Sequence, residues 1–315
     1  MDLINKYFKV LDDGFIALKG YMGSDLDIEQ AARVSYGKGT RKVSDTRSLL
    51  RYLMRHHHTT PFEMSELTFH IRLPIYVVRQ WHRHRTWSYN EYSGRYSEMI
   101  DSMEKTSEWR SQSGTNKQGS GDKISDEWAD GFEKMEVFGT VGDFLSGQEK
   151  ELHETLTEAY KMRLSIGVAK EQARKDLPVS NYTEMYAKTD LKNLMHFMSL
   201  RCDSHAQLEI RLYANIIAGI VKELFPITFE AWYDYAFTAS NWTRLDKTLL
   251  ALLLSNCGSS FHDFKGDDKI DKMAEEIGMS KRELDEFWEK YMGYPEDNFS
   301  LDNIKEYNEK ITQDS

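Results

Sequence analysis

Residues 66–74 constrain the fold most strongly, because apolar and polar side chains alternate along them without interruption. The apolar set is Leu67, Phe69, Ile71 and Leu73, and the polar set is Glu66, Thr68, His70 and Arg72. A period of two residues places one set on each face of a β-strand. We therefore expect a half-buried strand over these residues. Pro74 is tolerated in the first turn of a helix, so a helix is expected to follow along residues 75–85.

The rest of the body is expected to contain two further strands and several capped helices. Residues 14–22 and 180–190 have the composition of strands. Helix N-caps are expected at Ser24-Asp25, Ser44-Asp45 and Asp190. The most strongly periodic helix is expected to start at Asp203-Ser204, with its apolar stripe in the core or in a subunit interface. This stripe consists of Leu208, Leu212, Ile216, Ile220 and Leu224.

Two regions differ from this body in composition. Residues 111–123 are rich in Gly, Ser and Gln, so a flexible surface loop is expected there. From about residue 125 the pattern is helical again, in two segments of which the second stops at Pro178. Residues 245–315 are helical and rich in charge, without a cluster of site-like residues. We expect two domains, residues 1–244 and an accessory helical extension over 245–315.

The composition excludes several classes of protein. The formal net charge of −10 argues against a protein that coats nucleic acid through its overall charge. No segment approaches the roughly 18 unbroken apolar residues of a membrane span, and the N-terminus lacks the apolar core of a signal peptide. The two cysteines, Cys202 and Cys257, offer neither a disulfide framework nor metal-ligand spacing. We expect a cytoplasmic protein that acts on small partners.

One basic stretch, residues 83–97, stands out against this acidic background. It contains Arg83, Arg85 and Arg95 among Ser, Asn and Tyr donors. Guanidinium groups are forked, permanently charged donors that suit phosphates and planar acceptor edges. We expect an anionic, planar ligand, bound by a helix end over the first three residues and by a polar loop over the rest. An alternative is a module that binds single-stranded nucleic acid on a basic and aromatic platform. This platform would consist of Arg79, Arg83, Arg85 and Arg95 with Trp87, Tyr89, Tyr92 and Tyr96.

The histidines suggest another alternative, a metal-dependent hydrolase that uses His56, His58, His82 and His84. Consecutive residues on a helix point about 100° apart, so the run of histidines over 56–58 does not converge on one ion. The H-E-x-x-H type of ligand spacing is missing. We therefore expect no metal site.

Five blocks, taken in order, resemble the flavin-dependent thymidylate synthases. The central block is Arg83-His84-Arg85, followed after seven residues by Ser93. The other blocks are Ala32–Ser35, His58–Glu63, Ala173–Pro178 and Leu200–Gln207. A lone Arg-His-Arg would carry little weight, whereas all the blocks in the family's order are specific. The resemblance covers roughly residues 14–237.

The resemblance implies the reductive methylation of dUMP to dTMP. Methylenetetrahydrofolate would be the carbon donor, NADPH the reductant and FAD the hydride carrier. The implied subunit is α+β, with a central mixed sheet flanked by helices, and four identical subunits share their active sites in a homotetramer. No Gly-x-Gly-x-x-Gly follows a strand, so the flavin is not expected in a doubly wound dinucleotide fold.

The family's motifs imply a set of residues for dUMP. It consists of Gln80, Arg83, Glu91, Tyr92, Ser93, Gly94, Arg95, Arg174 and Arg201. Arg83 and Arg201 should lie against the pyrimidine. The phosphate and sugar should be held by Gln80, Ser93, Gly94, Arg95 and Arg174. We expect Arg201 to be the catalytic residue, because a fixed cation stabilises developing negative charge without proton transfer. Ser93 has no His or carboxylate in its own motif to deprotonate it, so a binding role is expected.

A second set is implied for FAD. It consists of Ser35, His58, Thr60, Glu63, Arg83, His84, Arg85, Glu91, Asp190, Lys192 and His196. Some family members have Asn-x-Arg where this chain has residues 190–192, and Asn where it has His196. Lys192 could still meet a pyrophosphate, whereas Asp190 could contact it only through the backbone. His196 is open to two interpretations, a structural histidine or a flavin contact.

Overall fold

The computed structural model describes residues 3–34, 45–114, 119–127, 139–256, 268–279 and 281–292. The chain forms two compact units, which divide between Trp232 and Tyr233. All the expected site residues belong to the first unit, although Ser35 lies outside the described residues. The expected division at residues 244 and 245 into an enzyme domain and an extension stays a prediction.

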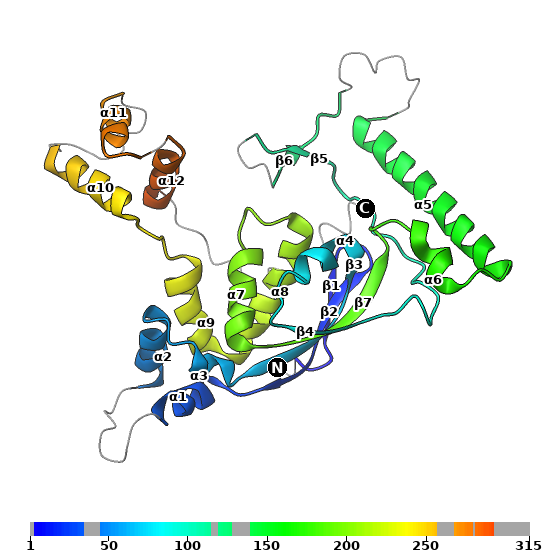
Figure 1. Ribbon diagram of the computed structural model, residues 1–315, viewed down its shortest axis with the longest axis horizontal. Coiled ribbons are helices and arrows are strands. Elements are labelled where there is room, and N and C mark those ends of the chain that lie inside the picture. Colours follow the sequence, from blue (N-terminus) through cyan, green and yellow to red (C-terminus); the bar gives the residue numbers. More distant parts are fainter. Residues whose placement is uncertain are drawn as a thin grey trace. The chain divides into compact units, whose positions relative to one another are not determined.

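A five-stranded sheet organises the first unit, in the order β1-β2-β3-β7-β4 (Figure 1). The strands are β1 (Tyr7–Val10), β2 (Gly14–Met22), β3 (Glu66–Pro74), β7 (Tyr182–Asp190) and β4 (Ser88–Glu91). The three strands expected from the sequence are confirmed. Every pairing between these strands is antiparallel, so the expected mixed sheet is wrong. The register gives the reason: Met22 at the end of β2 pairs with Glu66 at the start of β3, so the chain re-enters the sheet where it left.

The apolar face of β3 lies in the core, as its alternation predicts. Its four apolar side chains are each 0% exposed. Helices α7 (Leu191–Arg201) and α8 (Leu208–Leu224) pack against each other, and α8 also packs on β1 and β2 (Figure 1). Leu212, Ile216 and Ile220 of the apolar stripe are at most 4% exposed. The middle of the stripe is therefore core, while Leu208 and Leu224 at its ends are partly exposed.

Helix α8 begins at Leu208, so the expected start at Asp203-Ser204 is wrong. The Asp203 carboxylate accepts a hydrogen bond from the His205 amide at 2.8 Å and contacts the His205 ring nitrogen at 2.8 Å. An aspartate that bonds to the backbone two residues further on stabilises a turn of its own. Gln207 takes the N-cap position instead.

Three helices connect β2 to β3: α1 (Asp25–Arg33), α2 (Thr46–Arg55) and α3 (Thr60–Glu63). The side chains of Ser24 and Asp45 accept hydrogen bonds from backbone amides in the first turns of α1 and α2. The Asp190 side chain does the same for α7. These expected N-caps are confirmed, while Ser44 lies outside the described residues.

Part of the expected loop over residues 111–123 is a β-hairpin. Strands β5 (Arg110–Gln112) and β6 (Ser120–Lys123) pair antiparallel, and residues 115–118 lie outside the described part. The Gln112 side chain donates to the Gly119 carbonyl at 3.1 Å, and Arg110 forms an ion pair with Glu209 of α8 at 2.5 Å. This tertiary anchor makes strands out of a segment whose composition predicts a loop.

The second helical region begins later than expected. Helix α5 (Val141–Ser165) starts with a capping box formed by Thr140 and Asp143. Residues 128–138, which precede it, are not among the residues that the structure describes. The chain turns at Gly167, where φ is 85°. The following segment is only a short helix α6 (Lys170–Ala173) and a 3-10 turn (Arg174–Asp176).

The second unit contains helices α10 (Arg244–Asn256), α11 (Asp268–Glu276) and α12 (Lys281–Met292). The helical character expected here is confirmed for the described residues. An apolar cluster within the unit consists of Leu249, Leu253, Ile270, Ala274, Met279, Leu284, Phe287 and Trp288. Buried beside Lys290, Asp246 accepts a hydrogen bond from its ammonium group at 2.9 Å. Among all described helices, none is long and apolar enough to cross a membrane.

The buried carboxylate of Asp25 links α1 to α9 (Pro226–Trp232). We therefore expect its removal to lower the stability of the fold. Its oxygens accept hydrogen bonds from the amides of Ile227 (2.9 Å) and Thr228 (3.0 Å) and from the Thr228 hydroxyl (2.6 Å). In Asp25→Ala these donors lose their partner, so urea unfolding should show a loss of about 3 kcal/mol in the free energy of unfolding. Asp27→Ala, on the exposed side of α1, should cost less than about 1 kcal/mol. Equal losses in both variants would contradict the tie.

Candidate active site

Helix α4 (Ile75–Trp81) leads into the basic stretch. It ends at Trp81, so the helix expected to run to Arg85 is wrong. The Tyr89 hydroxyl donates to the carbonyl oxygens of Trp81 at 3.1 Å and His84 at 2.9 Å, which stabilises a turn in place of further helix. The turn buries His84 and leaves Arg83 and Arg85 exposed. Arg83 and His84 therefore have different surroundings.

His84 and Arg201 form the central contact of the site. Arg201 is the last residue of α7, and its Nε donates to His84 Nε2 at 3.1 Å while a terminal nitrogen donates to the Gln80 carbonyl at 3.3 Å. His84 is 7% exposed. Burial, and then the charge of Arg201, lower the pKa of His84 to about 4, so the imidazole is neutral at neutral pH and Nε2 can accept. Arg201 is thus a cation held in place by two hydrogen bonds.

Two more residues join this cluster from other elements. The Gln80 side-chain amide donates to the side-chain carbonyl of Gln207, the residue before α8. The rings of His84 and His196 are 6.0 Å apart. Gln207 was not among the expected site residues, although it ends the block that contains Arg201. Its place in that block is the signal that could have identified it.

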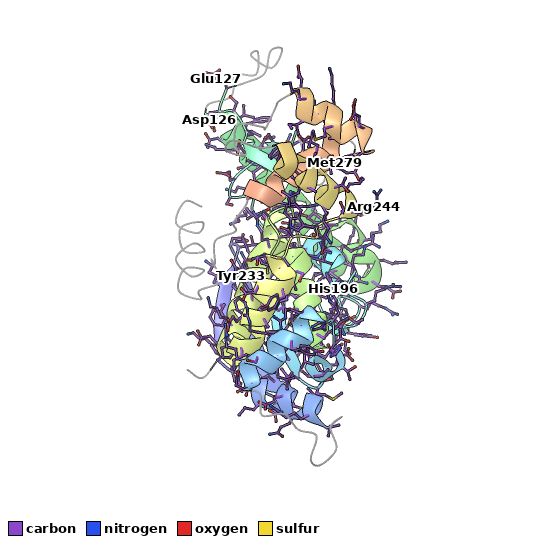
Figure 2. All side chains as sticks on the ribbon, turned by 90° about the vertical axis from the view of Figure 1, so that its left-hand side faces the viewer. Asp126, Glu127, His196, Tyr233, Arg244 and Met279 are labelled. Atoms are coloured by element: carbon purple, nitrogen blue, oxygen red, sulfur yellow. The ribbon has the colours of Figure 1, made fainter. Side chains whose placement is uncertain are left out.

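The residues expected at FAD lie mostly around α3 and α7, which pack against each other. Lys192 and His196 are one turn apart on α7, and His196, labelled in Figure 2, is exposed. The Asp190 carboxylate accepts two hydrogen bonds from Asn193, one from its backbone amide at 2.8 Å and one from its side-chain nitrogen at 2.6 Å. Both carboxylate oxygens of Asp190 are therefore used in the helix cap. Thr60 and Glu63 of α3 are exposed, and Ser35 lies outside the described residues.

His58 belongs to an exposed cluster of rings at the end of α2. The Tyr52 ring is 4.3 Å from the His56 ring and 5.9 Å from the His58 ring. His57 has a φ of 56°, in the left-handed region that non-glycine residues rarely adopt. The chain turns there from α2 toward α3.

The loop half of the basic stretch starts from β4, the edge strand beside β7. The Glu91 carboxylate accepts a hydrogen bond from the Thr183 hydroxyl at 3.0 Å, and the Tyr92 amide donates to the Glu184 carbonyl at 2.8 Å. Both bonds reach β7. The start of the loop is therefore fixed to β7, the strand next to the edge of the sheet.

Ser93, Gly94 and Arg95 form a turn beside Arg174. The amides of the two residues after Arg95 donate to the Ser93 carbonyl at 3.2 and 3.1 Å. A Cβ at Gly94 would lie 3.0 Å from Arg174 Cδ and would collide with a methionine, so this close approach depends on glycine. Arg95 forms an exposed ion pair of 3.3 Å with Glu171 of α6. The structure thus brings together the loop residues and Arg174, which were expected around a phosphate.

The expected dUMP residues therefore form two groups in one chain. Gln80 and Arg201 belong to the first, with His84, whereas residues 93–95 and Arg174 belong to the second. In the described part of the chain, no hydrogen bond or ion pair links the two groups. Arg83 and Arg85 are exposed between them along the chain.

The two alternatives find little support in this geometry. Trp87 is 5% exposed and packs on Trp81 and Phe197, with ring centroids 5.8 and 5.2 Å away. Tyr89 uses its hydroxyl to hold the turn, so half of the aromatic platform for single-stranded nucleic acid faces the core. Among the described residues, no group of three or more His, Cys, Asp and Glu side chains could hold a metal ion.

Comparison with known proteins identifies relatives of the chain. A family model described as "Thymidylate synthase complementing protein" matches residues 17–227. The chain is 41% identical over 299 residues to the flavin-dependent thymidylate synthase of Ehrlichia ruminantium (strain Welgevonden), with 94% of this chain and 90% of the relative covered. Identity to the protein of the same name from Dictyostelium discoideum is 44% over 248 residues, covering 76% and 77%.

Solved structures show a similar fold. The crystal structure of the UMP/dUMP methylase PolB from Streptomyces cacaoi bound with 5-Br UMP is 33% identical, with a TM-score of 0.61, and covers 73% of this chain and 97% of that chain. The same protein bound with 5-Br dUMP also has a TM-score of 0.61. The similarity extends over nearly the whole of that chain.

The neutral state of His84 predicts a pH dependence of stability. Because its pKa is about 4 in the folded chain and 6.5 ordinarily, the unfolded chain binds a proton between these values that the folded chain does not. Lowering the pH from 8 to 5 should therefore lower the contribution of His84 to the free energy of unfolding by about 2 kcal/mol. Urea unfolding of the wild type and of His84→Gln, whose amide does not titrate, measures the difference. The same pH dependence in both proteins would refute it.

Proposed function

The chain belongs to the family of flavin-dependent thymidylate synthases, and we propose that it methylates dUMP to dTMP in the cytoplasm, with methylenetetrahydrofolate as carbon donor and NADPH as reductant. The observation that carries this proposal is the fixed cation at Arg201. A guanidinium has five N–H donors, and two of these are engaged by His84 and Gln80. The others are free to meet a carbonyl oxygen of uracil.

Arg201 is suited to the charge that the reaction develops. For C5 of uracil to attack an electrophilic carbon, negative charge must accumulate on the ring carbonyls. A cation that is already fixed stabilises this charge without reorganising, and its effect is larger where water is partly excluded. Arg201 is half-buried and held by two hydrogen bonds, so it meets both conditions. Arg83, exposed on the turn after α4, is assigned to the pyrimidine as a second cation.

The phosphate and sugar of dUMP are assigned to residues 93–95 and Arg174, with Gln80. The two guanidinium groups of Arg95 and Arg174, which lie beside this tight turn, match the roughly two negative charges of a phosphate monoester. Glu91 and Tyr92 position this turn through their bonds to β7. The Ser93 hydroxyl accepts a hydrogen bond from the Arg95 amide at 3.3 Å, which suits a binding role.

The residues of the site work without a protein nucleophile in this proposal. Cys202 follows Arg201 directly, but burial raises the pKa of its thiol well above the ordinary value. A thiol that stays protonated is a poor nucleophile. Among the described residues, no histidine or carboxylate forms a hydrogen bond with Ser93. Activation of uracil is therefore assigned to the positive charge of Arg201.

The enzyme uses a flavin, and the donor set around α3 and α7 fits FAD. Arg83, Arg85 and Lys192 are cations that suit its pyrophosphate, and the exposed rings of His58 and His196 suit contact with its ring system. His84, Thr60, Glu63, Glu91, the Asp190 backbone and Ser35 complete the proposed set. When bound there, FAD would supply hydride-transfer chemistry, with NADPH as the source of the hydride.

We also infer a homotetramer in which subunits share active sites. Within one chain the pyrimidine group, around Arg201, and the phosphate group, around Arg174, are not linked by a hydrogen bond or ion pair among the described residues. One subunit supplying the first group and a second subunit supplying the other would form a complete site. Arg83 and Arg85, which are exposed and lie between the two groups along the chain, suit a boundary between two subunits.

The proposal is tested with purified full-length protein. It should be yellow, with the absorbance of FAD, and it should oxidise NADPH faster when dUMP is present. With methylenetetrahydrofolate added, dTMP should appear. Colourless protein that binds no added FAD would overturn the proposal.

Arg201→Ala should separate cofactor binding from catalysis. The variant should keep FAD, whereas kcat for dTMP formation should fall about 100- to 1,000-fold, because the developing charge loses its fixed cation. Arg79→Ala, an exposed arginine of α4, is the matched control and should leave kcat nearly unchanged. Near-normal turnover in Arg201→Ala would refute the assigned role.

A further inference from the structure

Gln207 occupies the N-cap position of α8 without acting as a cap. N-cap residues are usually Ser, Thr, Asp or Asn, whose side chains accept hydrogen bonds from amides of the first turn. Within the described part of the chain, the Gln207 side chain makes no such bond. Its carbonyl oxygen Oε1 instead accepts a hydrogen bond from Nε2 of Gln80, one residue before the end of α4. A side chain that departs from a local rule in this way is often part of a functional site.

The connection between α7 and α8 holds Gln80 at both of its ends. Arg201, the last residue of α7, donates from a terminal nitrogen to the Gln80 backbone carbonyl at 3.3 Å. Gln207, immediately before α8, binds the Gln80 side chain. The main chain of Gln80 is therefore tied to the pyrimidine group around Arg201, while a different residue directs its side-chain amide.

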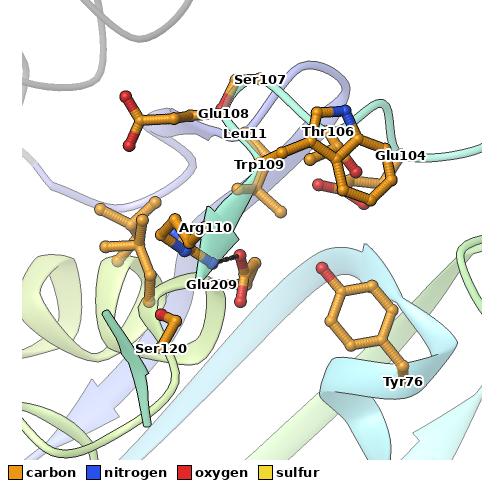
Figure 3. Close-up of a pocket in the computed structure, with 12 residues that line it drawn as sticks. Leu11, Tyr76, Glu104, Thr106, Ser107, Glu108, Trp109, Arg110, Ser120 and Glu209 are labelled. Atoms are coloured by element: carbon orange, nitrogen blue, oxygen red, sulfur yellow. Dashed lines mark hydrogen bonds and ion pairs between the residues drawn. The ribbon is translucent and has the colours of Figure 1, made fainter. Parts of the chain in front are cut away.

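The backbone that carries Gln207 is fixed by neighbouring bonds. The Gln207 carbonyl accepts a hydrogen bond from the Arg211 amide at 3.1 Å, which starts the helix. Two residues further on, Glu209 forms its ion pair of 2.5 Å with Arg110 of β5 (Figure 3). The Arg211 guanidinium also donates to the Ser204 carbonyl at 2.6 Å. Gln207 Oε1 is thus an acceptor attached to a fixed part of the chain.

Half of the hydrogen-bonding capacity of the Gln80 amide nitrogen is left for a ligand. A primary amide has two N–H donors and one carbonyl acceptor. Gln207 takes one N–H of Gln80, and the Gln80 side chain makes no other hydrogen bond with the described residues. Gln80 is half-buried, so a ligand can still reach it. Because both N–H groups lie in the plane of the amide, fixing the first one also fixes the direction of the second.

We propose that Gln207 is a positioning residue for dUMP: by binding the first N–H of Gln80, it aims the second N–H at an oxygen of the phosphate. This assignment rests on the proposed function, in which Gln80 helps to hold the phosphate and sugar. A phosphate dianion only accepts hydrogen bonds, so it requires the N–H end of the amide. Holding a glutamine side chain in place before dUMP arrives removes part of the entropy cost of binding.

The simplest alternative is a bond that only stabilises the fold. Helices α4 and α8 already contact each other, and the buried rings of Trp81 and Tyr213 lie 6.2 Å apart between them. Gln80 and Gln207 are only half-buried, so their bond should add little to stability. The two roles differ in what they predict, because a structural bond affects unfolding whereas a positioning bond affects the affinity for dUMP.

Isothermal titration of the full-length, FAD-loaded protein with dUMP tests the proposal in Gln207→Leu, which removes the acceptor. The dissociation constant for dUMP should rise about five- to tenfold, because Gln80 loses its orientation. The value of kcat at saturating dUMP should change less than about twofold, and the thermal unfolding midpoint less than about 2 °C. Gln148→Leu, at an exposed position of α5, is the matched control and should bind dUMP like the wild type.

A double variant decides whether Gln207 acts through Gln80. Gln80→Leu alone should weaken dUMP binding at least as much as Gln207→Leu, because the contact itself is lost. The double variant should then bind dUMP no more weakly than Gln80→Leu. Wild-type affinity in Gln207→Leu, or additive losses in the double variant, would overturn the positioning role and leave the proposed function standing. A wild-type protein that does not bind dUMP would overturn both.

Discussion

The antiparallel pairing of β3 with β7 determines where the other elements of the first unit lie. Glu66 is opposite Asp190 and Pro74 is opposite Tyr182, so α7 starts beside the beginning of β3 while α4 starts at its end. At 1.5 Å per residue, α7 extends about 16 Å and can carry Arg201 back toward α4. A shift of one residue in this register would turn the apolar face of β3 away from the core. The contact between His84 and Arg201 thus depends on the register of two central strands.

Most local signals in the sequence predict local structure correctly, and tertiary contacts explain several of the failures. The alternation over residues 66–74 and the caps at Ser24, Asp45 and Asp190 each need only a few neighbouring residues, and all are confirmed. The end of α4 depends instead on the Tyr89 hydroxyl, which binds Trp81 from the far side of a turn. The antiparallel sheet likewise depends on a register between distant segments, which no local pattern contains.

Motif positions predict which site residues come together better than they predict what each one contacts. Gln80 and Arg201 meet, and Gly94 meets Arg174, as the family's blocks imply. The burial of His84 could not be predicted, because it follows from the turn rather than from its own neighbours.

The apolar cluster of the second unit bears on how such a chain can evolve. The match to the family model ends at residue 227, shortly before the division between Trp232 and Tyr233. Each unit has its own buried apolar side chains among the described residues, so a cut at this boundary passes through neither core. Substitutions within one of these cores therefore need no compensating change in the other.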